Sequence, residues 1–310
     1  MIKSVLKSKF LGALVGTGVG DALGAPFEGR YRVKPEEVEA IAEKREVLTY
    51  TDDTHMMIGV AESLIRAGGF DGEDMTYTFI QNYELEPFRG YGLGPPRIFR
   101  AIRAGAAWDI AAQELYRGGS FGNGSAMRIA PIGVFYHDDP ARLTEVAFKS
   151  SQITHAHNLG KEGASLQAYA IALATNLKPQ SAFNRGDFLA KLINYAPPAV
   201  YNEKLNKIEG LLAEPDRARV AIELGNGIEA FNSVPAAIYS FLTHPHSFAR
   251  AVVNAVSLGG DTDTIGAMTG AISGAYLGIE SIPGSWEAKL ENKLYIKELA
   301  EKLWELKATA

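Results

Sequence analysis

Glycine recurs at every fourth position in two segments that lie at opposite ends of the chain. The first segment contains Gly12, Gly16, Gly20 and Gly24, and the second contains Gly266, Gly270, Gly274 and Gly278. A spacing of four residues places them on one face of a helix, and a helical face made of glycine lets another backbone approach closely. The pattern therefore predicts two glycine-faced helices that pack tightly inside an all-helical core.

Composition excludes several classes of protein. The chain has 310 residues, 46% of them hydrophobic, and a formal net charge of -5. This balance can support a large buried core, so intrinsic disorder is excluded. The absence of cysteine removes disulfides, zinc–thiolate sites and thiol nucleophiles, and the acidic excess argues against nucleic-acid binding. We therefore expect a cytoplasmic protein without direct nucleic-acid binding.

The N-terminal segment has some features of a signal peptide. Lys3, Lys7 and Lys9 precede an apolar run over residues 10–20. Asp21 interrupts the end of that run, and its regular glycines fit a packed helix better. No other stretch approaches the roughly 18 uninterrupted apolar residues that span a bilayer. We therefore expect this segment to belong to the folded domain, with no membrane association.

Helical periodicity dominates the rest of the chain. Apolar residues at helical spacing predict helices at 57–65, 164–177, 248–256 and 286–306. Glycine-rich loops lie between helices, at 89–96, 117–125 and 257–264. Few segments show the alternation of apolar and polar residues that is typical of strands, and no low-complexity linker divides the chain. The sequence predicts one compact all-α domain over residues 1–310.

Two short acidic segments each directly precede a predicted helix: Thr51-Asp52-Asp53-Thr54 and Asp261-Thr262-Asp263-Thr264. Asp and Thr at a helix N-cap accept hydrogen bonds from free backbone N–H groups, so capping explains either segment taken alone. A cap needs one side chain, however, whereas each segment has two carboxylates and two hydroxyls. Oxygen-only ligands suit a hard divalent cation such as Mg²⁺ or Mn²⁺. If the segments converge, the four carboxylates repel one another unless metal neutralises them.

Other residues are weaker candidates. Glu28 follows the first glycine-faced helix, although a lone loop glutamate is more often solvated surface. The loop 118–124 can direct backbone N–H groups toward an anion and has an aromatic residue available for stacking. The histidine pairs at 155/157 and 244/246 lack helical i, i+4 metal spacing. Dinucleotide-binding and P-loop glycine motifs are absent from the sequence.

Taken together, these segments resemble the ADP-ribosylglycohydrolase family. The resemblance is carried by GDALGAPFE (20–28), YTDDTHM (50–56), RGYGLG (89–94), GGSFGNGSAMRIAPIG (118–133), ITHAHNLG (153–160) and SLGGDTDTIGAMTGAISGAY (257–276). These motifs occur in the family's order and cover nearly the whole chain. The GSFGNGSAMR loop, residues 223–242 and IPGSW (282–286) are most similar to the branch that hydrolyses serine-linked ADP-ribose, poly(ADP-ribose) and O-acetyl-ADP-ribose.

The resemblance implies an orthogonal multi-helix fold and a hydrolase that cleaves the O-glycosidic bond at C1″ of ADP-ribose. It also implies a binuclear Mg²⁺ site, with Mn²⁺ as the alternative ion. One ion would be held by Thr51, Asp52 and Asp53, the other by Asp261 and Thr264, with Asp263 as the bridge. Glu28 would lie on a mobile flap that contacts the metal site when closed. It is the first candidate for the catalytic base, and Asp261 is the second.

The other implied residues would bind substrate. The diphosphate and distal ribose would lie in the loop of Gly119, Ser120, Phe121, Gly122 and Asn123. His155 would contact a phosphate, and Gly90 and Gly92 would line the same channel. Adenine would stack on Phe121, with Tyr116 as a second aromatic face. Asn226 and Ile228 would line the adenosine end.

Two alternative functions stay open. The chain could hydrolyse ADP-ribosylarginine, or it could be a non-catalytic relative that binds ADP-ribose or has a structural role. An oxygen ligand at every implied metal position speaks against the second alternative. The expected partners are ADP-ribosylated proteins, poly(ADP-ribose) and O-acetyl-ADP-ribose, and the expected oligomeric state is a monomer.

Overall fold

The structure is a computed structural model that describes residues 3–178, 183–196 and 199–309. The prediction of an all-α fold is confirmed, because the chain is 71% helical and no strand occurs in these described ranges. The α-helices are α1 (Lys3–Gly24), α2 (Pro35–Lys44), α3 (Asp52–Ala67), α4 (Gly72–Leu85), α5 (Gly94–Arg103), α6 (Ala111–Leu115), α7 (Ala130–Phe135), α8 (Pro140–Gln152), α9 (Asn158–Asn176), α10 (Arg185–Tyr195), α11 (Val200–Ala213), α12 (Arg217–Glu223), α13 (Ala230–Thr243), α14 (Phe248–Val256), α15 (Thr262–Leu277), α16 (Gly284–Lys289) and α17 (Lys293–Thr309). Two 3₁₀ helices are η1 (Ala25–Phe27) and η2 (Ile279–Ser281).

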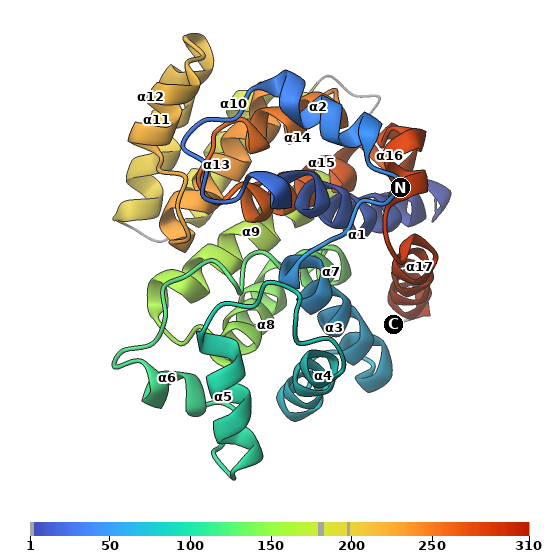
Figure 1. The fold of residues 1–310 in the computed structure, drawn as a ribbon, viewed down its shortest axis with the longest axis vertical. Coiled ribbons are helices and arrows are strands. Elements are labelled where there is room, and N and C mark those ends of the chain that lie inside the picture. Colours follow the sequence, from blue (N-terminus) through green and yellow to red (C-terminus); the bar gives the residue numbers. More distant parts are fainter. Residues whose placement is uncertain (1–2, 179–182, 197–198, 310) are drawn as a thin grey trace.

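The two glycine-faced helices, α1 and α15, lie side by side and antiparallel near the centre of the molecule (Figure 1). A Cβ atom at Gly16 would overlap the carbonyl oxygen of Gly270, and one at Gly20 would overlap that of Gly266. The two backbones therefore touch directly, and a larger residue at these positions would force the helices apart. The prediction of tight packing inside the helical core is confirmed, and the structure shows that the two glycine faces pack against each other.

By length and composition, residues Lys3–Phe27 could cross a bilayer, and no other helix of the described residues passes that test. The apolar window is 83% buried inside the molecule. Its surroundings are those of a core helix, because α15, α17, α7 and α3 cover it.

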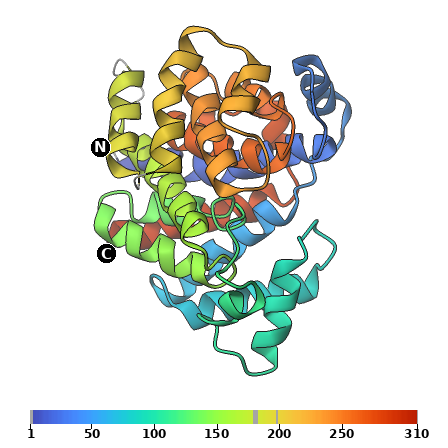
Figure 2. The same cartoon turned by 90° about the vertical axis from the view of Figure 1, so that its left-hand side faces the viewer.

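One hydrophobic cluster extends from Phe10 in α1 to Leu303 in α17. The helices α9, α13 and α14 pack against α15, whereas α5 and α6 form an outlying pair over a small separate cluster (Figures 1 and 2). The assignment of residues 1–310 to one domain stays a prediction.

Most of the predicted helices lie where expected. The segments 57–65 and 248–256 fall in α3 and α14, and 164–177 falls in α9 except for its last residue. The tail differs from the prediction, because α16 ends at Lys289 and α17 begins only at Lys293. Here the Leu48 N–H donates to the Lys289 carbonyl at 2.9 Å, and the Glu291 N–H donates to the Leu48 carbonyl at 3.0 Å. These long-range bonds replace helical ones and break the leucine-striped segment in two.

Candidate active site

Both acidic helix starts open into one cavity of about 290 Å³. One wall consists of oxygen-bearing side chains from three separate segments: Glu28, Thr51, Asp52, Asp53, Asp261, Asp263 and Thr264. The sequence left open whether these segments meet, and the structure brings them together. Their roles as ligands and base stay predictions.

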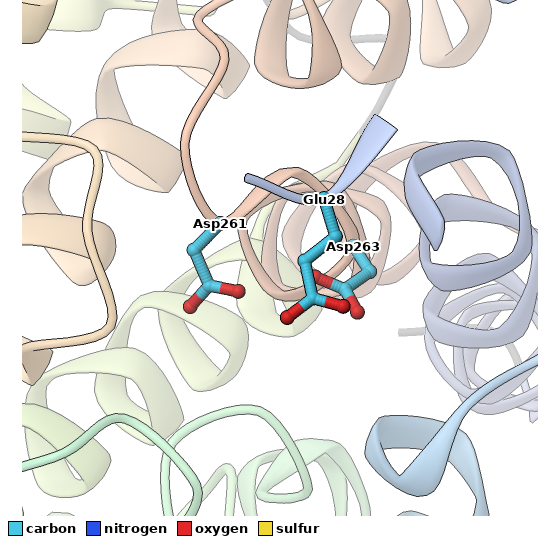
Figure 3. A group of neighbouring side chains, drawn as sticks. All are labelled: Glu28, Asp261 and Asp263. Atoms are coloured by element: carbon cyan, nitrogen blue, oxygen red, sulfur yellow. The ribbon is translucent and has the colours of Figure 1, made fainter. Parts of the chain in front are cut away.

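At the start of α15, the carboxylates face the cavity, and one oxygen of Asp263 also accepts from the Thr264 N–H at 2.9 Å. Ligand oxygens of Asp261, Asp263 and Glu28 lie within 4.8 Å of one another and point to the same side (Figure 3). The Asp261 side chain makes no cap hydrogen bond to α15 and instead accepts one from Asn123 Nδ2. Glu28, proposed as a flap residue, therefore belongs to the tightest carboxylate group of the described chain. Backbone hydrogen bonds join Gly29 and Arg30 to Gly260, so the segment lies against the site here.

At the start of α3, capping and ligand functions are divided between residues. The Thr51 hydroxyl caps the helix by accepting from the Asp53 N–H at 3.4 Å. Asp53 Oδ1 is buried and has no hydrogen-bond partner among the residues described. A buried acceptor without a partner is costly unless a proton or a cation satisfies it. The donor set therefore fits a hard divalent cation.

Asp21 lies behind Thr51 and is completely buried. It accepts hydrogen bonds from the N–H and hydroxyl groups of both Thr51 and Thr54, at 2.6–3.1 Å. The carboxylate thus holds the first turn of α3 against α1. The sequence interpretation treated Asp21 only as an interruption of the apolar run. The position of this carboxylate at the end of an apolar run could have indicated that it is buried and bound by partners, because a buried charge requires them.

The carboxylates perturb one another strongly. Burial, and then the charge of Asp21, raises the pKa of Asp52 to about 7. Burial, and then the charge of Asp261, raises the pKa of Asp263 to about 9. The pKa of Asp53 lies well above its usual range because of burial and the neighbouring Asp263. Without a cation, this wall therefore retains protons at neutral pH.

The opposite wall includes much of the predicted substrate loop. It contains Gly90, Gly92, Tyr116, Ser120, Gly122, Asn123, His155 and Ile228. The loop is tied to the start of α13, because the Asn123 N–H donates to the Ile228 carbonyl and the Ala230 N–H donates to the Phe121 carbonyl. Among the described residues, the N–H groups of Ser120 and Gly124 have no acceptor. They are available to donate to a ligand.

Three predicted substrate residues lie outside the cavity lining: Gly119, Phe121 and Asn226. The Phe121 ring is 46% exposed and lies 5.6 Å from the His157 ring. Gly119 packs against the backbone of Ala156 and His157. Asn226 lies behind the acidic wall, where its carbonyl accepts from the Asp261 N–H at 2.8 Å. Substrate contact by these three residues stays a prediction.

Asn123 has a position that the sequence did not indicate. Its side-chain nitrogen donates to both Asp261 Oδ2 and Ser233 Oγ. Both amide hydrogens are therefore used, and only the side-chain oxygen is left for a ligand. Asn123 thus connects the loop wall to the acidic wall.

Several lining residues were not named as candidates from the sequence: Met56, Gly94, Pro95, Met127 and Thr154. Met56 follows Asp52 by four residues, so helical spacing was the one usable signal for it. His157 is the N-cap of α9, where its Nδ1 accepts from the Leu159 N–H. His157 therefore has a structural role at the start of α9.

Comparisons with known proteins agree with these features. Residues 3–310 match the family model described as ADP-ribosylglycohydrolase. ADP-ribosylhydrolase ARH3 of Gallus gallus is 37% identical over 347 residues, covering 96% of this chain and 93% of that protein. The ARH3 of Homo sapiens is 36% identical over 341 residues, covering 96% and 93%. A solved structure titled ADP-ribosylglycohydrolase-related protein complex superposes with a TM-score of 0.78 at 26% identity, covering 98% of this chain and 99% of that one. The chain is therefore a glycosyl hydrolase that belongs to the ADP-ribosylglycohydrolase family.

Proposed function

We propose that this chain is a Mg²⁺-dependent hydrolase that releases ADP-ribose from O-linked substrates: serine-linked adducts, poly(ADP-ribose) and O-acetyl-ADP-ribose. One observation carries the proposal, namely that two acidic helix starts and Glu28 face a glycine-rich loop and His155 across one cavity. The acidic wall suits a hard cation and ribose hydroxyls. The loop wall suits a diphosphate. The name of the relatives, ADP-ribosylhydrolase, supports the same substrate chemistry.

The metal would be held by the oxygen donors of the acidic wall. One candidate ligand group is Thr51, Asp52 and Asp53, and the other is Asp261, Asp263 and Thr264. When bound, Mg²⁺ supplies positive charge that orients the ribose hydroxyls and stabilises charge near the reacting carbon. Mn²⁺ takes the same oxygen ligands and is the alternative ion.

Glu28 is the first candidate for the general base. Cleavage at C1″ passes through an oxocarbenium-like transition state, and a carboxylate assists by taking a proton from the attacking water. Glu28 is exposed at the cavity and can exchange that proton with solvent. Burial and the charge of Asp261 raise its pKa, which strengthens it as a base. Asp261 is the second candidate, since its bond to Asn123 fixes its orientation.

The residues of the loop wall would bind and orient the substrate. The N–H groups of Ser120 and Gly124 and the imidazole of His155 are donors available to phosphate oxygens. Tyr116 and Ile228 supply apolar surface for the adenine. Holding both ends of the substrate places C1″ at the acidic wall.

The deciding assay incubates the protein with a serine-ADP-ribosylated peptide in Mg²⁺ and then in EDTA. We expect release of ADP-ribose in Mg²⁺ and loss of release after chelation. An arginine-linked peptide runs in parallel, and faster release from it would overturn the proposed substrate class. Calorimetry that detects ADP-ribose binding without release from either peptide would indicate a non-catalytic binding protein.

A further inference from the structure

A fully buried arginine stands beside the substrate loop without an ion-pair contact among the described residues. Arg128 lies just before α7, and none of its surface is exposed. It takes part in none of the ion pairs found within the described residues. Its guanidinium carbon lies 4.7 Å from the centre of the Phe79 ring. Since an unpaired buried cation costs stability, fold stability alone does not account for it.

Arg128 determines the direction of the hydrogen bonds around it. Its Nη2 donates to the Ser150 carbonyl at 3.0 Å, and its Nη1 donates to Thr154 Oγ1 at 2.8 Å. A guanidinium only donates, so the threonine oxygen must accept. The hydroxyl proton of Thr154 is then free to donate elsewhere. Its one other partner among the described residues is His155 Nδ1, at 2.8 Å.

The state of the His155 ring follows from this bond. A ring nitrogen that accepts a hydrogen bond carries no proton, so a neutral imidazole then has its proton on Nε2. Burial, with a further contribution from the charge of Arg128, lowers the pKa of His155 to about 3. The ring is therefore neutral at physiological pH. Electrostatics therefore keeps the ring neutral, and the hydrogen-bond direction places its proton on Nε2.

The Nε2 atom lies beside the glycines of the substrate loop. His155 lines the cavity, and its Nε2 has no hydrogen-bond partner among the described residues. A Cβ atom at Gly124 would lie 2.9 Å from Nε2, and one at Gly122 would lie 3.4 Å from it. The glycines of the loop thus leave room for the ring, and its unpartnered Nε2 lies among residues that line the cavity.

We propose that Arg128 and Thr154 are positioning residues that fix His155 as a neutral imidazole with its proton on Nε2, as a donor to a phosphate oxygen. This inference rests on the proposed function, because the acceptor is the diphosphate of an ADP-ribose substrate. The opposite tautomer would present a lone pair to that anion, and the two would repel.

The direct test is ¹⁵N NMR of the imidazole nitrogens of the full chain in Mg²⁺. The protein has six histidines, and His155→Gln assigns the signals of His155 by their loss. We expect a protonated Nε2 and an unprotonated, hydrogen-bonded Nδ1 without any substrate. This measurement does not depend on catalysis. A protein that fails to bind ADP-ribose would refute the proposed function while the spectrum still decides the tautomer.

The second test compares Thr154→Val with Thr154→Ser. Valine keeps the shape of threonine but cannot donate to Nδ1, whereas serine keeps the hydroxyl. We expect Thr154→Val to shift the Nδ1 signal and to weaken ADP-ribose binding by calorimetry about tenfold, as for a lost hydrogen bond to a charged group. Thr154→Ser should restore both readouts. Arg128→Met, which leaves the hydroxyl unoriented, should weaken binding about threefold.

Two results would overturn the proposal. One is a protonated Nδ1 on His155 in the unsubstituted protein, because Thr154 would then accept from both neighbours. The other is a Thr154→Val protein with a lower melting temperature but unchanged Nδ1 signal and ADP-ribose affinity. That second result would make Thr154 a packing residue only.

Discussion

The two acidic helix starts have nearly the same residues but are held in different ways. Thr51 caps α3, and Asp21 behind it binds the first turn through four donor groups. The start of α15 has no such carboxylate behind it. Its Thr262 hydroxyl donates to the Gly24 carbonyl at 2.9 Å, and the backbone of Asp263 lies directly against Gly24. One start is thus anchored by a buried charge and the other by close backbone packing.

This difference explains why both segments keep carboxylate oxygens for the cavity. The hydroxyl of Thr51 supplies the cap of α3. At the start of α15, Asp261 makes no cap bond, and one oxygen of Asp263 accepts from the Thr264 N–H at 2.9 Å. In both segments another part of the chain fixes the helix end, so Asp52, Asp53, Asp261 and Asp263 remain directed to the cavity. Supporting contacts outside the cavity therefore determine which oxygens are free for a metal.

Gly24→Ala should disrupt the α15 start while leaving Asp21 intact. A Cβ atom at Gly24 would lie 2.5 Å from both the Cα and the N of Asp263, which forces backbone apart. We expect the free energy of unfolding to fall by about 3 kcal/mol, measured by urea denaturation. Gly210→Ala is the matched control, since its Cβ would meet nothing within 4 Å and alanine suits a helix. Equal stability of the two variants would refute the packing argument.

Asp263→Asn and Asp52→Asn test the candidate metal ligands at the two helix starts directly. Each replaces a candidate carboxylate ligand by a neutral amide, so we expect Mg²⁺ affinity to drop and activity to fall more than about a hundredfold. Calorimetric Mg²⁺ titration and the serine-linked peptide assay measure the two effects. Full activity of Asp263→Asn at low Mg²⁺ would exclude its predicted bridging position.

Asp21→Asn should loosen the first turn of α3 and leave the start of α15 unchanged. The amide keeps one acceptor oxygen, so some of the Thr51 and Thr54 donors lose their partner. We expect activity to fall about 10- to 100-fold, as for residues that orient metal ligands. Higher Mg²⁺ should restore part of it. If activity were lost without any change in the Mg²⁺ requirement, Asp21 would not act through the ligands of α3.

The two helix starts should also differ in how they make stability depend on pH, because their carboxylates have different pKa values. Asp263 has its pKa raised to about 9 and Asp52 to about 7, both from a usual 3.8. The folded protein therefore holds protons that the unfolded chain releases above about pH 4. In the metal-free protein, the contribution of these two groups to stability is fully present below that pH. It falls as pH rises toward the folded pKa values, by about 1.4 kcal/mol per pH unit for each retained proton.

Melting temperatures in EDTA at pH 5.5 and 8 measure this slope. We expect a lower value at pH 8, and a larger rise on adding Mg²⁺ there, because protons compete with the metal for carboxylates. Asp263→Asn should flatten the slope over a wider pH range than Asp52→Asn. A metal-free protein that melts higher at pH 8 would contradict the assigned charges.

Local patterns in the sequence predicted much of the fold. The glycine spacing predicted both central helices and their tight packing, because periodicity of four residues is a property of the helix itself. That the two faces contact each other is seen only in the structure. The leucine stripe over 286–306 failed to predict the break after Lys289, because a bridge to Leu48, distant in sequence, supplies the competing hydrogen bonds. Local periodicity contains no information about such a partner.

The site shows the same contrast between what the local sequence predicts and what contacts between distant segments decide. The sequence by itself determined which ligand types the two acidic segments offer, because without cysteine and with paired Asp and Thr they present only hard oxygen atoms. Only the tertiary structure showed that Asp21 supports α3, that Asn123 binds Asp261, and that Arg128 and Thr154 stand behind His155. The types of side chain are set by the sequence itself. The partner of a buried polar group is set by folding, because it depends on which distant segments the packing of α1 against α15 brings together.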